Sequence, residues 1–298
     1  MRYRTIVGEF HIHYPDRPRQ GPQPDGDTIT FKPDDPSFIR SLMRFGNFGP
    51  DFNRRGMIGV RFEGIDALET HFQGSHQQPE LAYQARDFML AHMGFQNVVF
   101  FDDNPDVVQS VSDHPRRGYI LANGIDGNGR VLAFVYPGQP SHADGELTFL
   151  DRPLMMSSAN LAVLGAGLAY AAIYTSLPID LATDLRMVTR EIRASSSRLY
   201  GRESFDTQTS SPINDLDELE SMVMWPKLFR RLVSFFSSGH SALADLDQWL
   251  REDPVHRDDR LLLPNGELGN MHDLVVVERN AIRLALNPEE VTILPDNG

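Results

Sequence analysis

The stretch Met57-Ile-Gly-Val-Arg-Phe-Glu-Gly-Ile-Asp-Ala-Leu-Glu-Thr70 begins as an apolar strand pattern and ends in a small, polar and acidic run. Its bulky apolar residues, which suit a barrel core, are Val60, Phe62 and Ile65. Its charged residues are Arg61, Glu63, Asp66 and Glu69. Side chains alternate across a strand, so Arg61 and Asp66 converge only if the strand bends or stops near Ile65. We therefore expect a strand that leads into a loop from Asp66 to Thr70 and forms the edge of an active site.

Length and composition bound the class of protein. The chain has 298 residues, of which 41% are hydrophobic, enough for two modest domains or for one domain with a large appendage. No apolar run approaches the roughly 20 residues that a membrane span needs. Only Ile6 and Val7 precede Gly8, so no signal-peptide core is visible, and we expect a cytoplasmic protein without a membrane partner. The absence of cysteine excludes disulfides, thiolate metal sites and cysteine nucleophiles.

The charge is unevenly distributed along the chain. The net charge of −13 argues against binding nucleic acid by overall electrostatics. Residues 202–298 hold nine Lys or Arg against eighteen Asp or Glu, whereas residues 1–201 hold 19 against 23 and are nearly balanced. Almost every cation is an arginine, whose forked geometry suits phosphate. We therefore expect the acidic region to repel nucleic acid and to confine it to the face that carries Arg61 and Arg130.

Residues 3–14 alternate as a first strand and carry two histidines of the same parity, His11 and His13. These are either a metal pair or two histidines on a half-exposed strand face. Because no third ligand follows nearby in the sequence, the second interpretation is favoured.

Apolar periodicity and turn residues predict the other elements. Expected helices are 37–44, 79–93, 157–167, 180–200, 217–237 with a kink at Pro226, and 241–251. Residues 25–31 are expected to form an Asp-Gly-Asp turn that leads into a strand, and 274–277 and 291–294 are expected strands. Residues 119–122 and 131–136 are expected to form a hairpin, because the Asp-Gly and Asn-Gly pairs between them supply the positive-φ residues of its turn.

Four short motifs follow one another in a specific order. They are Asp25-Gly-Asp-Thr28, Arg61-Phe-Glu-Gly-Ile-Asp-Ala-Leu-Glu-Thr70, Asp126-Gly-Asn-Gly-Arg130-Val-Leu-Ala-Phe-Val-Tyr136 and Ala159-Asn-Leu-Ala-Val-Leu-Gly-Ala-Gly-Leu-Ala-Tyr170. In sequence and order they resemble the staphylococcal nuclease (thermonuclease) family, over residues 3 to about 201. The resemblance implies an α+β fold, with a five-stranded OB-fold β-barrel and packed helices in residues 1–201 and an insertion at 33–56. An acidic, mainly helical region at 202–298 follows.

The resemblance also implies a metal-dependent nuclease that hydrolyses phosphodiester bonds of DNA, RNA or both. Calcium is the implied cofactor, with Mn²⁺ or Mg²⁺ as substitutes. The implied metal ligands are Asp27, Asp66 and the backbone carbonyl of Ala67; Arg61 and Arg130 are implied to hold phosphate, and Glu69 to act as general base. This set is chemically sufficient, because a phosphodiester gains negative charge as water attacks it. Such a site needs a hard cation, fixed positive groups and a carboxylate that takes the proton.

The chain departs from the family pattern at three places. Ala67-Leu68 replaces the family's Thr-Pro, which a backbone carbonyl ligand tolerates. Asn128 stands where an aromatic is expected, and the tyrosine expected near the fifth strand lies one place off, at Tyr174. We therefore expect Asn128 and Tyr174 to contact the substrate, but differently from the corresponding residues of the family.

The insertion at 33–56 lies where an OB fold usually touches a single-stranded substrate. Its aromatic and basic residues are Phe45, Phe48, Phe52, Arg44, Arg54 and Arg55. They either stack bases and hold the backbone of a substrate, or pack inward within their own loop.

Two classes of function remain open. The first is the nuclease, as an endonuclease or an end-directed enzyme. The second is an OB-type nucleic-acid-binding or scaffold module that cuts weakly or not at all, which the acidic charge, the missing aromatic and the large appendage favour. The segment 217–237 is too apolar to stay in water. We expect it to pack against the barrel or its final helix, or against a second subunit or a protein partner.

Overall fold

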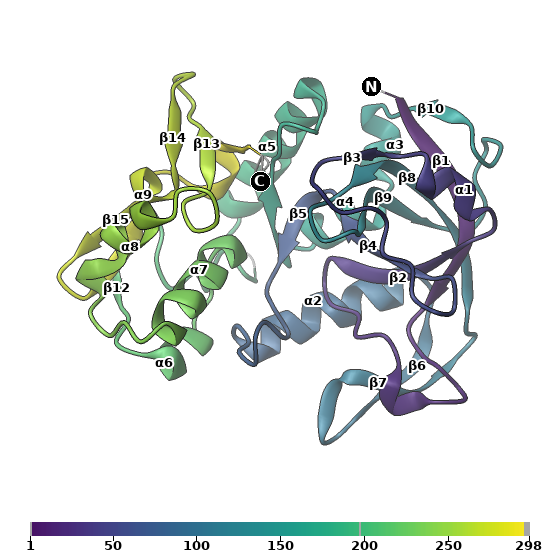
Figure 1. Cartoon of the computed structure of the whole chain (residues 1–298), viewed down its shortest axis with the longest axis horizontal. Coiled ribbons are helices and arrows are strands. Elements are labelled where there is room, and N and C mark those ends of the chain that lie inside the picture. The colour runs from purple at the N-terminus through teal and green to yellow at the C-terminus, as the bar shows by residue number, and fades with distance from the viewer. Residues whose placement is uncertain (1, 197, 295–298) are drawn as a thin grey trace. The chain divides into compact units, whose positions relative to one another are not determined.

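The computed structural model describes residues 2–196 and 198–294 (Figure 1). By internal contacts the chain forms two compact units. The first comprises the residues up to Ile65 and Gln84–Ala166, and the second comprises Asp66–Tyr83 and the residues from Gly167 onward. The chain thus passes between the units three times. The predicted boundary at residue 201, which concerns independently folding domains, stays a prediction.

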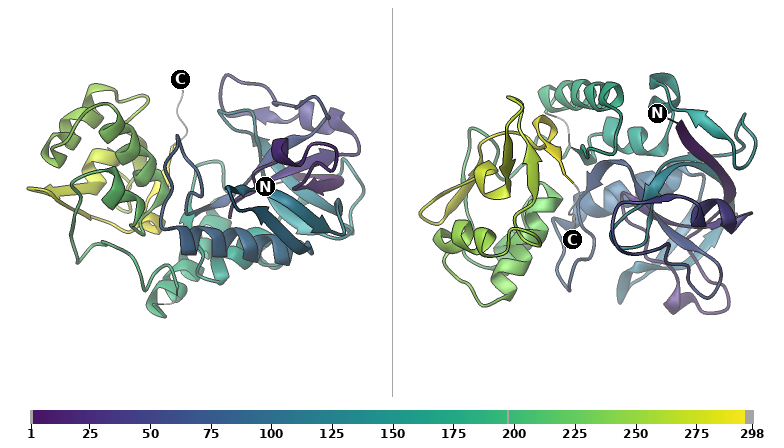
Figure 2. Two further views of the ribbon diagram at one scale, coloured as in Figure 1. Left: turned by 90° about the horizontal axis from the view of Figure 1, so that it is seen from below. Right: turned by 45° about the horizontal axis from the view of Figure 1, so that its top comes forward.

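A closed five-stranded mixed β-barrel forms the centre of the first unit (Figures 1 and 2). Its strands are β1 (Arg2–His11), β2 (Thr28–Pro33), β4 (Ile58–Phe62), β8 (Arg116–Ile125) and β9 (Val131–Pro137). The strand order is β1-β2-β4-β9-β8, and β1 also pairs with β8, which closes the sheet. The β4–β9 pair is parallel, whereas the other pairs are antiparallel. The prediction of an α+β chain with a barrel is confirmed.

Alternation along the strands fills the barrel. The side chains that are wholly buried include Tyr3, Ile6, Phe10, Phe31, Val60 and Phe134. The stretch from Met57 to Thr70 contributes to the barrel core through β4. There Ile58, Val60 and Phe62 are buried, and the intervening Gly59 and Arg61 are half-buried. Because successive side chains point to opposite faces, Gly59 and Arg61 share the face of β4 that is turned away from the core.

Smaller elements surround the barrel in the first unit. They are η1 (Pro18–Gln20), α1 (Pro36–Arg40), β3 (Met43–Arg44), β6 (Gln96–Phe101), β7 (Asn104–Ser112), β10 (Leu147–Phe149), α3 (Arg152–Met156) and α4 (Ala159–Gly165). Helix α2 (Pro79–His92) begins in the second unit and continues in the first. The predicted helices at 37–44, 79–93 and 157–167 and the hairpin are confirmed, with α1 shorter than expected.

The strand that carries Arg61 breaks at Glu63. A new strand, β5, runs from Gly64 to Ala67, and Gly64 has a φ of +85°, which glycine adopts without strain. The expectation of a break near Ile65 is thus close, but the expectation that Asp66 opens a loop is wrong. Asp66 and Ala67 are buried strand residues, and the irregular segment begins after them. Backbone pairing keeps Asp66 in a strand, and the acidic composition of residues 66–70 gave no indication of this pairing.

The second unit is a mixture of helices and short strands. Its helices are α5 (Ile179–Ala194), α6 (Leu216–Glu220), α7 (Pro226–Ser237), α8 (Leu246–Glu252) and α9 (Met271–Leu274), with η2 (Leu243–Asp245) and η3 (Pro288–Glu290). Its strands are β11 (Ala169–Ala172), β12 (Ser211–Pro212), β13 (Arg260–Leu262), β14 (Leu268–Asn270), β15 (Val275–Glu278), β16 (Ala281–Leu284) and β17 (Thr292–Ile293). They form the three-stranded sheets β12-β16-β15 and β14-β13-β17, and β11 pairs with β5. In the described part of residues 202–298 the helices α6 to α9 are joined by the strands β12 to β17, of which sequence analysis expected only 274–277 and 291–294, because strands of two to four residues are too short to show alternation.

Pro226 divides the predicted helix 217–237 into α6 and α7 rather than kinking it. Proline lacks the amide hydrogen that a helix interior needs, but it suits the first helical position, and α7 begins there. The apolar side chains of α7 are buried within the chain itself: Leu228, Phe229, Leu232, Val233 and Phe235. A protein partner or second subunit for this segment stays a prediction.

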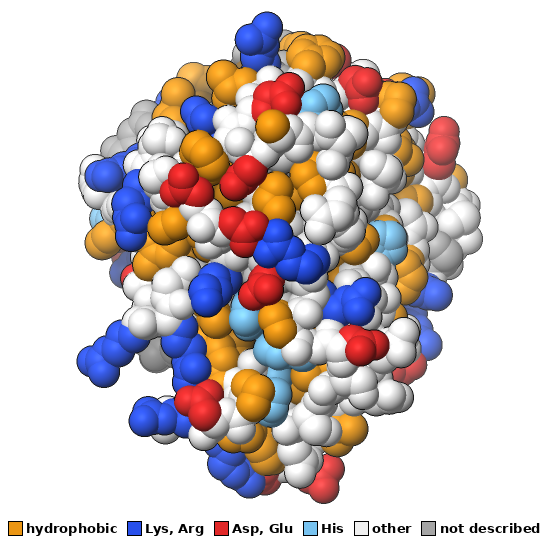
Figure 3. All heavy atoms as spheres, turned by 90° about the vertical axis from the view of Figure 1, so that its right-hand side faces the viewer, with side chains coloured by type: hydrophobic (Ala, Val, Ile, Leu, Met, Phe, Trp, Pro, Cys, Tyr) orange, Lys and Arg blue, Asp and Glu red, His pale blue; other side chains and the backbone are white. Residues whose placement is uncertain are grey.

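One face of the molecule mixes charges of both signs (Figure 3). On the face drawn in Figure 3, Lys and Arg side chains stand in separate groups with Asp and Glu side chains among them. None of the helices in residues 2–196 and 198–294 is both long enough and apolar enough to span a membrane.

Candidate functional site

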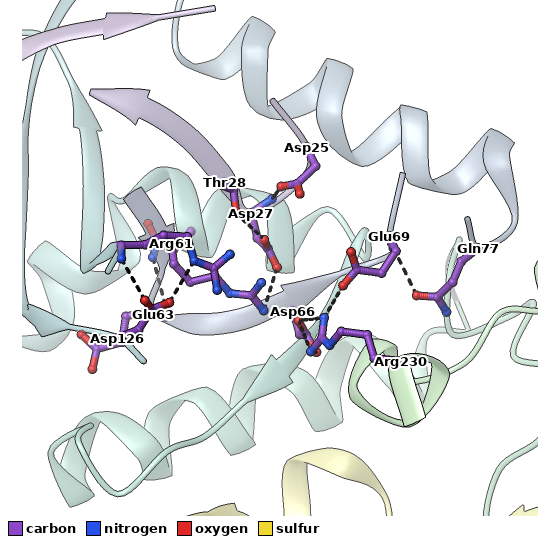
Figure 4. A network of polar contacts seen from close by, with 12 residues as sticks. Asp25, Asp27, Thr28, Arg61, Glu63, Asp66, Glu69, Gln77, Asp126 and Arg230 are labelled. Atoms are coloured by element: carbon purple, nitrogen blue, oxygen red, sulfur yellow. Dashed lines mark hydrogen bonds and ion pairs between the residues drawn. The ribbon is translucent and has the colours of Figure 1, made fainter. Parts of the chain in front are cut away.

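Asp27, just before β2, and Arg61, on the neighbouring strand β4, lie beside each other in the first unit (Figure 4). Asp27 directly precedes β2, and its neighbour Thr28 is opposite Arg61 in the β2–β4 ladder. The nearest atoms, Arg61 Nη2 and Asp27 Oδ2, are 3.4 Å apart. The Asp27 side chain is 4% exposed, and its backbone carbonyl accepts a hydrogen bond of 2.8 Å from the amide of Phe62. The strand pairing therefore fixes a buried carboxylate next to a guanidinium, a cation that suits phosphate.

Arg130 is held by the turn that precedes it. The Asp126 carboxylate accepts hydrogen bonds of 2.9 Å from the backbone amide and from the Nε of Arg130. The Asp126 side chain also accepts from the amide of Asn128, at 2.9 Å, and Gly129 has a φ of +79°. Asp126 therefore uses only the Nε of the guanidinium, and within the described chain the terminal nitrogens of Arg130 have no hydrogen bond or ion pair.

The two arginines predicted to hold phosphate share one face of β4. A Cβ placed on Gly59 would lie 3.4 Å from Cγ of Arg130, so the stem of Arg130 passes over Gly59. Gly59 and Arg61 are two residues apart in the same strand and point to the same side. The parallel pairing of β4 with β9 produces this arrangement, because it sets Val60 opposite Val131. Sequence spacing alone gave no reason to place these arginines on one face.

Asn160 positions the end of this strand, a role that sequence reasoning missed. It is wholly buried on α4, and its Nδ2 donates to the carbonyls of Glu63, at 2.9 Å, and Ala133, at 3.0 Å. Its Oδ1 accepts from the amide of Val135 at 2.9 Å. Glu63 itself is buried and accepts a 2.7 Å hydrogen bond from Asn123. An asparagine inside an apolar helix was the available signal, because such a polar group needs buried partners.

In the second unit, Arg230 binds both of the carboxylates assigned to metal binding and proton transfer. Its Nη2 lies 3.1 Å from Oδ2 of Asp66, and its Nη1 donates to Oε1 of Glu69 in a short contact (Figure 4). The side chains of Asp66, Glu69 and Arg230 are 2%, 12% and 19% exposed, so this is a largely buried cluster. Sequence reasoning missed Arg230, although a cation in the apolar run of α7 was a signal that it needs an acidic partner.

A buried glutamine supports the segment that carries Glu69. Gln77 accepts a 3.2 Å hydrogen bond from the amide of Glu69 and donates one of 2.9 Å to the carbonyl of Met224. The amide of Gln77 in turn donates to the carbonyl of Glu69, at 2.9 Å. These hydrogen bonds close the loop between Glu69 and Gln77 and connect it to Met224, just before α7.

The other cations of α7 bind a second buried carboxylate. Lys227 Nζ lies 2.6 Å from Oδ1 of Asp259, and Arg231 Nη2 lies 2.8 Å from its Oδ2. Burial opposes ionisation of Asp259, but Lys227 and Arg231 outweigh it and hold the pKa of Asp259 below its usual value. The Lys227 ammonium also lies 5.7 Å from the ring centroid of Tyr174.

The two altered substrate residues differ in exposure. Asn128 is exposed at the tip of the β8–β9 hairpin, and Tyr174 is half-buried after β11. Ala67 is 4% exposed at the end of β5. In the insertion, Phe48 is 66% exposed, whereas Arg40 stacks over the ring of Phe52 at 5.0 Å. Phe48 has the exposure that base stacking requires, as the first interpretation of this loop needs.

The donor chemistry of the predicted calcium ligands fits a hard cation only in part. Asp27 and Asp66 are buried carboxylates of the kind calcium accepts, but each has an arginine as neighbour. No group of three His, Cys, Asp or Glu side chains arranged to hold a metal is found in the described ranges. Asp66 and Glu69 share Arg230, so a cation held by these carboxylates competes with the positive charge of Arg230.

The predicted site residues therefore fall into two sets. Asp27, Arg61 and Arg130 lie in the first unit, and Asp66, Ala67 and Glu69 in the second. Neither a family model nor a curated protein matches the sequence.

Proposed function

We propose that the protein is a metal-dependent phosphodiesterase that acts on DNA or RNA. The observation that carries this proposal is the Arg61–Asp27 pair, in which the guanidinium of β4 and the buried carboxylate just before β2 are 3.4 Å apart. A guanidinium binds a phosphate through two oxygens and neutralises it, and Arg130 shares the face of β4 with Arg61. If the five barrel strands are numbered along the chain, their order in the sheet is 1-2-3-5-4. This order supports an OB-type barrel of the thermonuclease kind.

Each residue has a separate task in this proposal. Arg61 and Arg130 orient the phosphodiester and stabilise the charge that develops on its oxygens. Glu69 takes the proton of the attacking water. A bound divalent cation, calcium or in its place Mn²⁺ or Mg²⁺, supplies Lewis acidity and a more acidic water. Asp27, Asp66 and the carbonyl of Ala67 are the residues that would hold it.

A second function, nucleic-acid binding without cleavage, is favoured by one observation. Arg230 binds Asp66 and Glu69 together, so it neutralises the carboxylates that cleavage requires. A protein in which this cluster is permanent still presents Arg61, Arg130 and the exposed Phe48 to a strand. The two functions therefore differ in what Asp66 and Glu69 do, not in the basic face.

Purified protein incubated with plasmid, single-stranded DNA and RNA separates the two functions. Each substrate is tested with Ca²⁺, Mn²⁺ or Mg²⁺ and with a chelator. The nuclease proposal expects metal-dependent cleavage that falls by roughly two to four orders of magnitude in Arg61→Ala and Glu69→Gln. Arg117→Ala is the matched control, because Arg117 is an exposed arginine of β8 that pairs with Asp34 at 2.6 Å. Cleavage that survives in Arg61→Ala contradicts the assignment. Retained binding with no cleavage under any metal supports the binding module instead.

A further inference from the structure

The second unit contains a groove that the proposed cleavage chemistry does not use. It has a volume of about 510 Å³, within the roughly 300–1,000 Å³ typical of small-molecule sites. Helix α5, the segment after β11, the turn after β13 and the residues around η3 form its walls, and Figure 1 shows α5 beside β13. Its apolar lining includes Ile173, Leu177, Ala182, Leu262, Leu263 and Pro264. Such a wall suits the flat or apolar body of a ligand.

Two arginines stand together on one wall of this groove. Arg186 and Arg190 are four residues apart on α5, which places them on the same face of the helix. Arg186 donates to the carbonyl of Glu289 at 3.1 Å and to the hydroxyl of Thr292 at 2.6 Å, both uncharged acceptors. Arg190 is exposed, and in the described part of the chain neither arginine has a carboxylate partner.

This pairing of like charges is unfavourable without an anion. Burial and the neighbouring Arg190 lower the pKa of Arg186, which shows that the two cations oppose each other. Like charges at this spacing destabilise a helix. An anion between them relieves the repulsion and gains charge-assisted hydrogen bonds.

Acidic side chains near the groove are already engaged. Glu289 binds Arg193 through both oxygens, at 2.8 and 3.1 Å. Glu290 lines the groove, but its carboxylate accepts from the amide and the side chain of Asn287, at 2.9 and 3.2 Å. The cap on η3 thus holds Glu290, and the arginines remain available to a ligand.

We propose that this groove binds a mononucleotide, free or at the end of a nucleic-acid strand, with its phosphate on Arg186 and Arg190 and its base against Tyr174. A terminal phosphate carries nearly two negative charges, which match two guanidinium groups. Tyr174 lines the same groove and offers an aromatic ring on which a base stacks. Thr175 and Thr292 add hydroxyls that suit the sugar. The inference goes beyond cleavage and does not depend on it.

Titration calorimetry in the presence of a chelator tests the inference without any nuclease turnover. The ligands are a nucleoside 5′-monophosphate, the matching nucleoside, inorganic phosphate, and a short oligonucleotide with or without a 5′-phosphate. We expect the monophosphate to bind, the nucleoside to bind at least tenfold more weakly, and Arg190→Gln to weaken the monophosphate about ten- to hundredfold. Tyr174→Leu is expected to weaken the monophosphate but not inorganic phosphate.

Arg251→Gln is the matched control. Arg251 is an exposed arginine of α8 outside the groove, paired with Asp247 at 2.9 Å, and its loss should leave binding unchanged. Tighter binding of the 5′-phosphorylated oligonucleotide than of the monophosphate identifies a strand end as the source of the nucleotide, and the reverse identifies the free nucleotide. Equal affinity of wild type and Arg190→Gln, equal affinity for phosphate and nucleotide, or no binding at millimolar ligand overturns the inference.

Discussion

The guanidinium of Arg230 lies 3.1 Å from the buried carboxylate of Asp66, although 164 positions of sequence separate the two residues. The same guanidinium contacts Glu69. A residue outside the motifs thus neutralises two carboxylates inside them. Any chemistry proposed for Asp66 and Glu69 has to include Arg230, either as the group that restrains them or as a permanent structural partner.

Replacing Arg230 should destabilise the protein strongly. Arg230→Met removes a cation that binds the buried Asp66 and Glu69 carboxylates, and breaking a fully buried pair costs about 3–5 kcal/mol, somewhat less here. Urea denaturation at pH 7 measures the loss. Arg251→Met, which breaks an exposed pair, should cost less than about 1 kcal/mol. Equal effects of the two variants would show that the Arg230 cluster is not a stabilising contact.

Gly59 offers a test of the shared arginine face that changes no charged residue. In Gly59→Val the new side chain meets the Arg130 stem, 3.4 Å from the position of its Cβ, and moves Arg130 off β4. We expect cleavage or strand binding to fall roughly tenfold to a hundredfold, because small displacements of a positioning group are costly. Gly127→Ala, in the β8–β9 turn that carries Arg130 and with nothing within 4 Å of its added Cβ, is the control. A normal Gly59→Val protein would separate Arg130 from the site.

The histidines of the first unit should make stability depend on pH. His114 is 5.2 Å from His11 and 6.0 Å from His13 between ring centroids, so the structure supplies a third histidine to the pair noted in the sequence. Burial, and then repulsion from His11 and His13, lowers the pKa of His114 to about 4. The unfolded chain therefore binds a proton that the folded chain excludes between about pH 6.5 and pH 4, and stability falls as pH falls through this window.

Denaturation curves at pH 7 and pH 4.5 measure this loss. The half-exposed ring limits the contribution of His114 to roughly 1–2 kcal/mol. His114→Gln should reduce the difference between the two pH values. A variant that keeps the full pH dependence would show that His114 does not cause it.

A fragment of residues 1–201 should aggregate. Helix α5 buries Leu181, Leu185 and Thr189, and Arg193 on the same helix binds Glu203 and Glu289, both of which the fragment lacks. The apolar face of α5 then loses the part of its cover that η3 provides, and Arg193 loses both carboxylate partners. Light scattering measures the aggregation of the fragment. Full-length Glu289→Gln, a milder change that removes one charged partner of Arg193, is measured beside it. A soluble, monomeric fragment would support the domain boundary expected from the sequence.

The sequence predicts the local parts of this structure well. Alternation around Val60 and the turn glycines after Asp126 gave the barrel strands and the hairpin, because those signals are confined to a few neighbouring residues. The apolar run around Arg230 indicated that it needs an acidic partner, but sequence could not identify Asp66 as that partner, because the two residues are 164 positions apart. The strands of the second unit are two to four residues long, and Asp66 sits in a strand despite its acidic neighbours. Pairing partners, rather than propensity, fix such elements.

The threefold passage of the chain between the units has a consequence for biosynthesis. Segment 66–83 belongs to a unit whose remaining residues begin at Gly167. At the usual ribosomal rate of about 5–20 residues per second, Arg230 follows Asp66 by roughly ten to thirty seconds. During that interval the carboxylates of Asp66 and Glu69 have emerged without their cation, and hydrophobic Leu68 beside them lacks its cover. We expect segment 66–83 to need a chaperone that holds nascent chains during this interval, and slowing translation after residue 201 should raise that need.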